Sequence, residues 1–138
     1  MFKVDHLYPH IKQSVKVEWN LGKRCNYDCS YCLAVIHDNT SPHTDINILK
    51  NAVDELSKIN NIRISFTGGE PCVHPIILDL LEYARPKVSW LNITTNGTRT
   101  AEFYIDILDR LINNIVFSVH FEYDYQKVIE TVLNVAQH

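Results

Sequence analysis

Strand-like and helix-like patterns of apolar and polar residues alternate four times along the chain. In four segments the apolar residues recur at every second position, which is typical of strands with one apolar face. These segments are residues 15–21, 62–67, 88–94 and 115–121. Each segment precedes a stretch with apolar residues at helical spacing, and these stretches begin near Ile46, Ile76, Phe103 and Val128. Strand–helix alternation of this kind predicts a parallel sheet with crossover helices.

The other face of the predicted strands is polar. Parallel strands that are buried on both sides normally appear as continuous apolar runs. Here the second face carries Asn20, Ser65, Thr67, Asn92, Thr94, Asn96, Ser118, His120 and Glu122. These residues gather toward the carboxyl ends of the strands, where barrels and open α/β sheets place their sites. We therefore expect an α/β fold, a (βα)-repeat partial TIM-like barrel of about four units, with a ligand in its lumen. An open sheet with one solvated face is the alternative.

Local signals place two helix starts. Thr44 or Asp45 can cap the first helix, and Pro75 suits the first turn of the second. Among the remaining histidines, we expect His74 to be structural and His6, His10 and His138 to lie at the surface or near the termini.

Length and composition narrow the class of protein. The 138 residues predict a single domain over residues 1–138, and 46% hydrophobic with 21% charged residues is ordinary for a globular protein. A formal net charge of -3 provides no basic surface for nucleic acid or an anionic membrane. The apolar runs are far shorter than the roughly eighteen residues of a membrane span. The N-terminus lacks the apolar segment of a secretory signal, so we expect a cytoplasmic protein without disulfides.

The candidate chemistry begins with three cysteines, Cys25, Cys29 and Cys32, which follow the first predicted strand in the spacing C-x3-C-x2-C. Three thiolates from one loop can hold three irons of a cubane iron–sulfur cluster and leave the fourth iron open. The alternative is a structural zinc site completed by His37 or His43, although the three-residue gap is atypical of zinc half-sites. The cysteines alone leave both interpretations open.

A second motif follows the second predicted strand, where the sequence reads Thr67-Gly68-Gly69-Glu70-Pro71. Two glycines at a strand end allow positive φ and a close approach of backbone to a ligand. Glu70 then offers a carboxylate to a cationic group. A tight turn before a helix is the alternative interpretation.

Together these motifs resemble the radical S-adenosylmethionine (radical SAM) enzymes. The resemblance rests on the cysteine spacing with Tyr31 before the third cysteine, on residues 68–71, on Thr94-Thr95-Asn96-Gly97, and on Ser118-Val119-His120. It implies that Cys25, Cys29 and Cys32 hold a [4Fe–4S] cluster whose open iron is chelated by S-adenosylmethionine. It further implies that Gly68, Gly69, Glu70 and Pro71 contact the methionine amino group, that Tyr31 lies near the adenine, and that Asn96 and Ser118 contact the ribose or carboxylate.

The implied activity is reductive cleavage of S-adenosylmethionine to a 5′-deoxyadenosyl radical that abstracts hydrogen from a substrate. An electron donor such as flavodoxin or ferredoxin would be needed, and the substrate would be a small molecule or, slightly favoured, a peptide. A non-catalytic zinc-binding or iron–sulfur-binding module is the alternative function. His120 and Glu122 are candidates for contact with substrate or for proton donation, because strand parity places them on the same face as Ser118; a solvated sheet face is the alternative.

The chain departs from the family in two respects. Such enzymes usually contain six βα units, whereas four are recognisable here. We therefore expect a fragment or truncated product, or a half barrel completed by another chain or by self-association. A fourth cysteine, Cys72, directly follows the glycine motif, and we expect it to be a small apolar filler.

Overall fold

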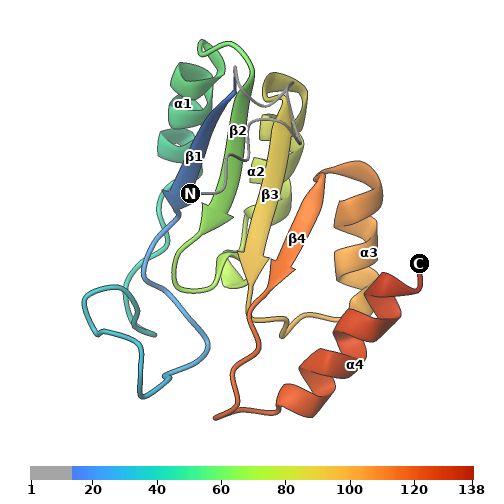
Figure 1. Cartoon of the computed structure of the whole chain (residues 1–138). Coiled ribbons are helices and arrows are strands. Elements are labelled where there is room, and N and C mark those ends of the chain that lie inside the picture. Colours follow the sequence, from blue (N-terminus) through green and yellow to red (C-terminus); the bar gives the residue numbers. More distant parts are fainter. Residues whose placement is uncertain (1–13) are drawn as a thin grey trace, which may run out of the picture.

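Four parallel strands form one sheet in the order β1–β2–β3–β4, in a computed structural model that describes residues 14–138 (Figure 1). The strands are β1 (Val15–Asn20), β2 (Ile62–Thr67), β3 (Trp90–Thr95) and β4 (Asn114–Phe117). Each strand pairs in parallel with the next one along the chain, so every connection must cross over the sheet. This topology confirms the predicted α/β fold of four βα units.

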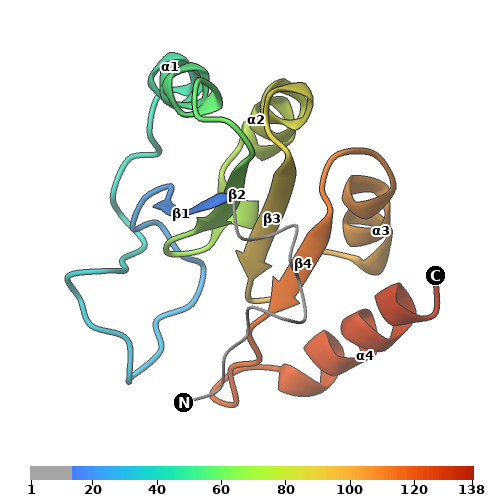
Figure 2. The same ribbon diagram turned by 45° about the horizontal axis from the view of Figure 1, so that its top comes forward.

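The crossover connections contain the helices α1 (Ile46–Ser57), α2 (Ile77–Ala84) and α3 (Ala101–Arg110), and α4 (Tyr125–Ala136) follows β4. Figure 2 shows α1, α2 and α3 along one face of the sheet, with α4 beside α3. The Asp45 carboxylate accepts a hydrogen bond from the amide of Asn47 and caps α1, as expected. Two 3₁₀ turns, η3 (Pro71–Val73) and η4 (Arg85–Lys87), precede α2 and β3.

The apolar core lies between the sheet and these helices. The sheet contributes Phe66, Leu91 and Ile93, and all three are 0% exposed. Leu80 and Ile107 face them from α2 and α3 and are equally buried. Burying a side chain of this size stabilises a fold by about 1.5–3 kcal/mol. The apolar face predicted from the alternation is therefore the helix-covered face.

The polar face of the sheet carries a ladder of side-chain hydrogen bonds across three strands. Asn114 donates from Nδ2 to Oδ1 of Asn92 (2.7 Å), and Asn92 donates from Nδ2 to Oγ of Ser65 (2.6 Å). The three residues are register partners on β4, β3 and β2. Within residues 14–138, no buried side-chain nitrogen or oxygen lacks a hydrogen-bond partner. The half-polar character of the sheet is thus accommodated by pairing between the strands.

Several predicted boundaries are wrong. β1 ends at Asn20 instead of Leu21, and β3 spans Trp90–Thr95 instead of residues 88–94. The fourth strand ends at Phe117 instead of Phe121, because the chain turns after Ser118 and the amide of Tyr123 donates to the carbonyl of His120 (3.1 Å). Pro75 lies before α2, which begins at Ile77. The strand-parity argument for His120 and Glu122 therefore fails, and their positions follow from the loop.

Some expectations fall outside this description. His6 and His10 lie outside the described residues, and a single domain over residues 1–138 stays a prediction. His138 is exposed, with Nε2 at 3.1 Å from the Asp109 carboxylate. In the part of the chain that the structure describes, every helix is too short or too polar for a membrane crossing.

Candidate functional site

A cavity of about 290 Å³ lies at the carboxyl end of the sheet. It is lined by Asn20, Cys25, Tyr27, Cys29, Cys32, Ile36, His37, Thr67, Gly68, Gly69, Glu70, Thr94, Thr95, Asn96, Ser118 and His120. The lining combines the ends of β1, β2 and β3, the residue that follows β4, and the segment that carries the cysteines. Nine of the residues predicted to bind the cluster, the cofactor or the substrate therefore meet at one place: Cys25, Cys29, Cys32, Gly68, Gly69, Glu70, Asn96, Ser118 and His120.

The three cysteines come from the cysteine loop, defined here as residues 21–45 between β1 and α1. All three carry free thiols; Cys29 is buried, and Cys25 and Cys32 are half-buried. The amide of Tyr27 donates to Sγ of Cys25 (3.4 Å). Burial raises the pKa of the Cys25 and Cys32 thiols, because it disfavours the thiolate. A bound cation would counter that effect.

The two glycines at the end of β2 allow this segment to pack against the backbone of the cysteine loop. The amide of Gly69 donates to the carbonyl of Gly22 (2.8 Å), and the amide of Glu70 donates to the carbonyl of Arg24 (2.8 Å). A Cβ atom on Gly69 would lie 2.3 Å from the carbonyl oxygens of both Lys23 and Arg24. The sequence-based argument assigned this close approach to a ligand, and the structure shows a close approach to the chain's own backbone as well.

The Glu70 carboxylate is buried and bonded to the protein. It is 3% exposed and accepts hydrogen bonds from the amide of Cys72 (2.8 Å), from Oγ1 of Thr95 (2.8 Å) and from the amide of Asn96 (2.6 Å). Desolvation raises the pKa of Glu70, and these hydrogen bonds oppose the shift. The carboxylate thus joins the end of β2 to the end of β3. Its predicted contact with a ligand's amino group stays a prediction.

A polar triad connects the cysteine loop to the β3–α3 connection. Asn96 donates from Nδ2 to Oδ1 of Asn26 (2.8 Å), and Asn26 donates from Nδ2 to Oγ1 of Thr98 (3.0 Å). Thr98 donates back to Oδ1 of Asn96 (2.8 Å). Sequence reasoning missed Asn26 and Thr98 as site residues, because no local pattern relates positions that lie 72 residues apart.

Three predicted residues lie outside the lining of this cavity. Tyr31 is 59% exposed, and its ring lies parallel to that of His120, with its hydroxyl against Nδ1. Pro71 is buried at the start of η3, and Glu122 is exposed and bonded to Ser30. The roles expected for Tyr31, Pro71 and Glu122 stay predictions. Cys72 is buried in the apolar core, where desolvation raises the pKa of its thiol.

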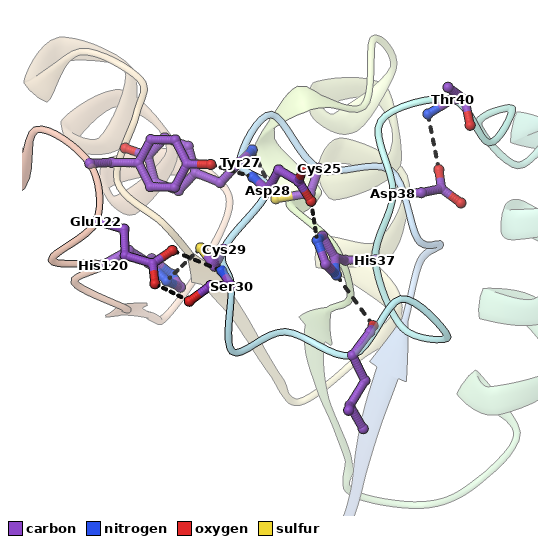
Figure 3. Close-up of polar contacts among 12 residues, drawn as sticks. Cys25, Tyr27, Asp28, Cys29, Ser30, His37, Asp38, Thr40, His120 and Glu122 are labelled. Atoms are coloured by element: carbon purple, nitrogen blue, oxygen red, sulfur yellow. Dashed lines mark hydrogen bonds and ion pairs between the residues drawn. The ribbon is translucent and has the colours of Figure 1, made fainter.

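The two histidines considered as zinc ligands are engaged elsewhere. Nε2 of His37 lies 3.1 Å from the Asp28 carboxylate and Nδ1 lies 3.3 Å from the carbonyl of Leu33 (Figure 3). The ring of His43 packs against that of His74, with centroids 4.5 Å apart. Both nitrogens of His37 are therefore bonded to other residues of the cysteine loop.

Two kinds of metal group were considered for the three cysteines, a single zinc ion and an iron–sulfur cluster. Among residues 14–138, no three His, Cys, Asp or Glu side chains converge tightly enough to hold one metal ion. Zinc would require thiolates about 2.3 Å from a common centre. A cubane cluster is larger, so its three thiolates attach to different irons.

Parallel βα units with a cysteine-lined cavity at the strand ends define a cofactor-binding protein of the α/β barrel class. The model of the family described as "Radical SAM superfamily" matches residues 19–135. The chain therefore belongs to the radical SAM superfamily, as the resemblance predicted. Enzymes of this superfamily use a [4Fe–4S] cluster and S-adenosylmethionine.

The relatives that this chain is similar to are named for different enzymes. The chain is 34% identical over 101 residues to a GTP 3′,8-cyclase of Desulforamulus reducens, covering 70% of this chain and 31% of the relative. It is 35% identical over 83 residues to an Fe-coproporphyrin III synthase of Methanosarcina barkeri, and 30% identical over 81 residues to the mycofactocin maturase MftC of Mycobacterium tuberculosis. Each of these two matches covers 59% of this chain and 21% of the relative. The chain thus spans a third or less of the length of these relatives.

Solved structures share the fold. A structure described as anSMEcpe with bound AdoMet matches with a TM-score of 0.70 at 18% identity, covering 90% of this chain and 41% of that one. A structure of BtrN in complex with AdoMet and 2-DOIA matches with a TM-score of 0.67 at 22% identity, covering 88% of this chain and 53% of that one. At these identities the matches establish the fold.

Proposed function

We propose that the chain is the S-adenosylmethionine-cleaving part of a radical SAM enzyme, with Cys25, Cys29 and Cys32 as ligands of a [4Fe–4S] cluster. The observation that carries this proposal is the shared cavity: three free thiols face the Gly68–Gly69 segment and the ends of β3 and β4 across one space. When bound, the cluster and S-adenosylmethionine supply an electron and a 5′-deoxyadenosyl radical for hydrogen abstraction.

The other predicted binding residues lie in or beside the lining of the cavity. The β2 end carries Gly68, which faces the cavity, and Pro71, which starts η3 behind it; we assign the methionine end of the cofactor to this side. Asn96 and Ser118 lie across the cavity, where their polar groups suit the ribose or carboxylate. We assign the adenine to the side of Tyr31, whose exposed ring lies parallel to that of the lining residue His120. Burial of Asn96 supports a fixed contact there.

Reductive cleavage of S-adenosylmethionine requires an electron donor, and hydrogen abstraction requires a substrate. A one-electron reductant such as flavodoxin or ferredoxin would deliver electrons to the cluster, and a reducing, cytoplasmic setting would preserve the free thiols. The substrate would be a peptide or a small molecule. The relatives are about three or more times longer than the matched region, so further βα units in the same protein or another chain would complete the wall of the barrel beside β4.

Anaerobic reconstitution with iron and sulfide tests the proposal. We expect about four irons per chain, broad absorbance near ~400 nm and, after reduction, cleavage of S-adenosylmethionine to 5′-deoxyadenosine. Cys29→Ala should lose most of the iron, because two thiolates remain. Cys72→Ala is the matched control, since Cys72 lies in the core, and it should retain the cluster. One tightly bound zinc without iron, or a full cluster in Cys29→Ala, would contradict the proposal.

A further inference from the structure

Three consecutive residues of the cysteine loop are each bonded by a side chain of the β4–α4 loop (residues 118–124). The Tyr123 hydroxyl accepts a hydrogen bond from the amide of Asp28 (2.5 Å). Nδ1 of His120 lies 3.5 Å from Sγ of Cys29. The Glu122 carboxylate accepts hydrogen bonds from the amide of Ser30 (2.8 Å) and from its hydroxyl. Figure 3 shows His120 and Glu122 pointing at this segment from the same side.

Ring packing strengthens the same contact. The rings of Tyr27 and Tyr123 are stacked, with centroids 3.8 Å apart and an interplanar angle of 8°. Stacked aromatic pairs contribute about 0.5–1.5 kcal/mol beyond the area they bury. The contact therefore combines an apolar stack at one end with directional hydrogen bonds along the next three residues.

The β4–α4 loop is itself anchored at both ends. The amide of Ser118 donates to the carbonyl of Thr95 (2.8 Å), which extends the pairing beyond β4. At the other end, the Asp124 carboxylate accepts from the amide of Lys127 (3.2 Å) and caps α4. A loop that is fixed to a strand and to a helix can orient a second loop. The cysteine loop has no regular helix or strand of its own between residues 21 and 45.

The negative charge of Glu122 strengthens its contact with the cysteine loop. Its two hydrogen bonds from Ser30 lower the pKa of the Glu122 carboxyl. A charged acceptor forms stronger hydrogen bonds than a neutral one. Without it, the amide and hydroxyl of Ser30 would rely on water, and Cys29 directly precedes Ser30. The position of the Cys29 thiol is therefore set by residues about 90 positions later in the chain.

We propose that the β4–α4 loop positions Cys29 for the cluster, and that His120, Glu122 and Tyr123 act as positioning residues. This inference rests on the proposed function, in which Cys29 is a ligand of the cluster. The sequence-based hypothesis placed His120 and Glu122 at the substrate. The contacts assign Glu122 to the cysteine loop and make His120 a neighbour of a ligand thiol.

The first test needs no cofactor. Amide hydrogen exchange, resolved by residue in the cluster-free protein, should rise roughly 2- to 10-fold at Ser30 in Glu122→Gln and at Asp28 in Tyr123→Phe, the change expected for loss of one hydrogen bond. The matched controls Glu130→Gln and Tyr125→Phe alter the same residue types in α4 and should leave both amides unchanged. The midpoint of urea unfolding should fall only slightly in Glu122→Gln and Tyr123→Phe, by no more than the loss of one hydrogen bond, and should stay the same in the two controls.

The second test uses the reconstituted protein. Glu122→Gln should lose iron to a chelator roughly 2- to 10-fold faster than the wild type, and combining it with Ser30→Ala should cost less than the sum of the two single changes. His120→Leu should alter the electron paramagnetic resonance signal of the reduced cluster. His120→Asn, which retains a nitrogen near Nδ1, should restore it.

The outcomes separate the two claims. Unchanged exchange at Ser30 and Asp28, or unchanged iron loss in Glu122→Gln, would overturn the positioning role while the wild-type cluster still supported the proposed function. A wild type that takes up no iron would overturn the proposed function, and the positioning role with it. Additive losses for Ser30→Ala and Glu122→Gln would also count against a shared contact.

Discussion

The apolar core and the cysteine loop are stabilised in different ways. In the core, Phe66, Leu91 and Ile93 are fully buried between the sheet and the helices. In the cysteine loop, Leu33 and Val35 are 66% and 64% exposed. Hydrogen bonds with three other loops fix the backbone of this loop and its Asn26 side chain. Burial is non-directional and roughly additive in area, whereas hydrogen bonds depend on the precise position of each partner. The core therefore supplies stability, and the directional contacts place the candidate ligands.

The largest loss of stability is expected for a substitution in the apolar core. Phe66→Ala should lower the free energy of unfolding by about 3–5 kcal/mol, because it removes a fully buried ring from the central part of the sheet. Phe121→Ala is the matched control: Phe121 is 76% exposed, and the change should stay within about 0.5 kcal/mol. Urea denaturation measures both. Equal losses for the two variants would show that the core and the loop surface are not energetically distinct.

An intermediate loss of stability is expected for a substitution at Glu70, between the apolar core and the candidate site. Glu70→Gln should lower the free energy of unfolding by about 1–3 kcal/mol, because an amide group replaces an acceptor oxygen and leaves one buried donor unpaired. It should also increase amide exchange at Asn96. The matched control Glu130→Gln changes an exposed carboxylate on α4. A stable Glu70→Gln with unchanged exchange would show that the carboxylate does not join β2 to β3.

The smallest loss of stability is expected for a change on the outer surface, outside both regions. Lys87 and Tyr83 lower the pKa of the Asp54 carboxyl through hydrogen bonds. A carboxyl with a depressed folded-state pKa contributes stability above its unfolded pKa, and that contribution is lost as pH falls through the folded pKa. Asp54→Asn should therefore be slightly less stable than wild type near neutral pH, and the difference should vanish in acid. A difference that persists or grows in acid would contradict this ion pair.

Much of the fold follows from residues close together in the sequence. The period-two and helical patterns identified the four strands and four main helices of residues 14–138, because apolar periodicity records which face of an element is buried. Thr44 or Asp45 was expected to cap the first helix, since capping acts within one helical turn, and Asp45 is the cap. The end of β4 could not be found in this way. The polar–apolar alternation continues to Phe121, and only the turn at His120–Tyr123 ends the strand.

The candidate site, too, was predicted from the sequence only where its residues lie close together in the chain. The sequence alone identified the cysteines, the glycine pair and Glu70, because their spacing is local and specific. Only the tertiary structure decided that Gly69 packs on the backbone of residues 23 and 24, and that the Glu70 carboxylate bonds to the end of β3. It also decided that Glu122 and Tyr123 contact the cysteine loop. These contacts join positions that are 26 to about 95 residues apart, and no local periodicity records a hydrogen bond that forms after the sheet has assembled.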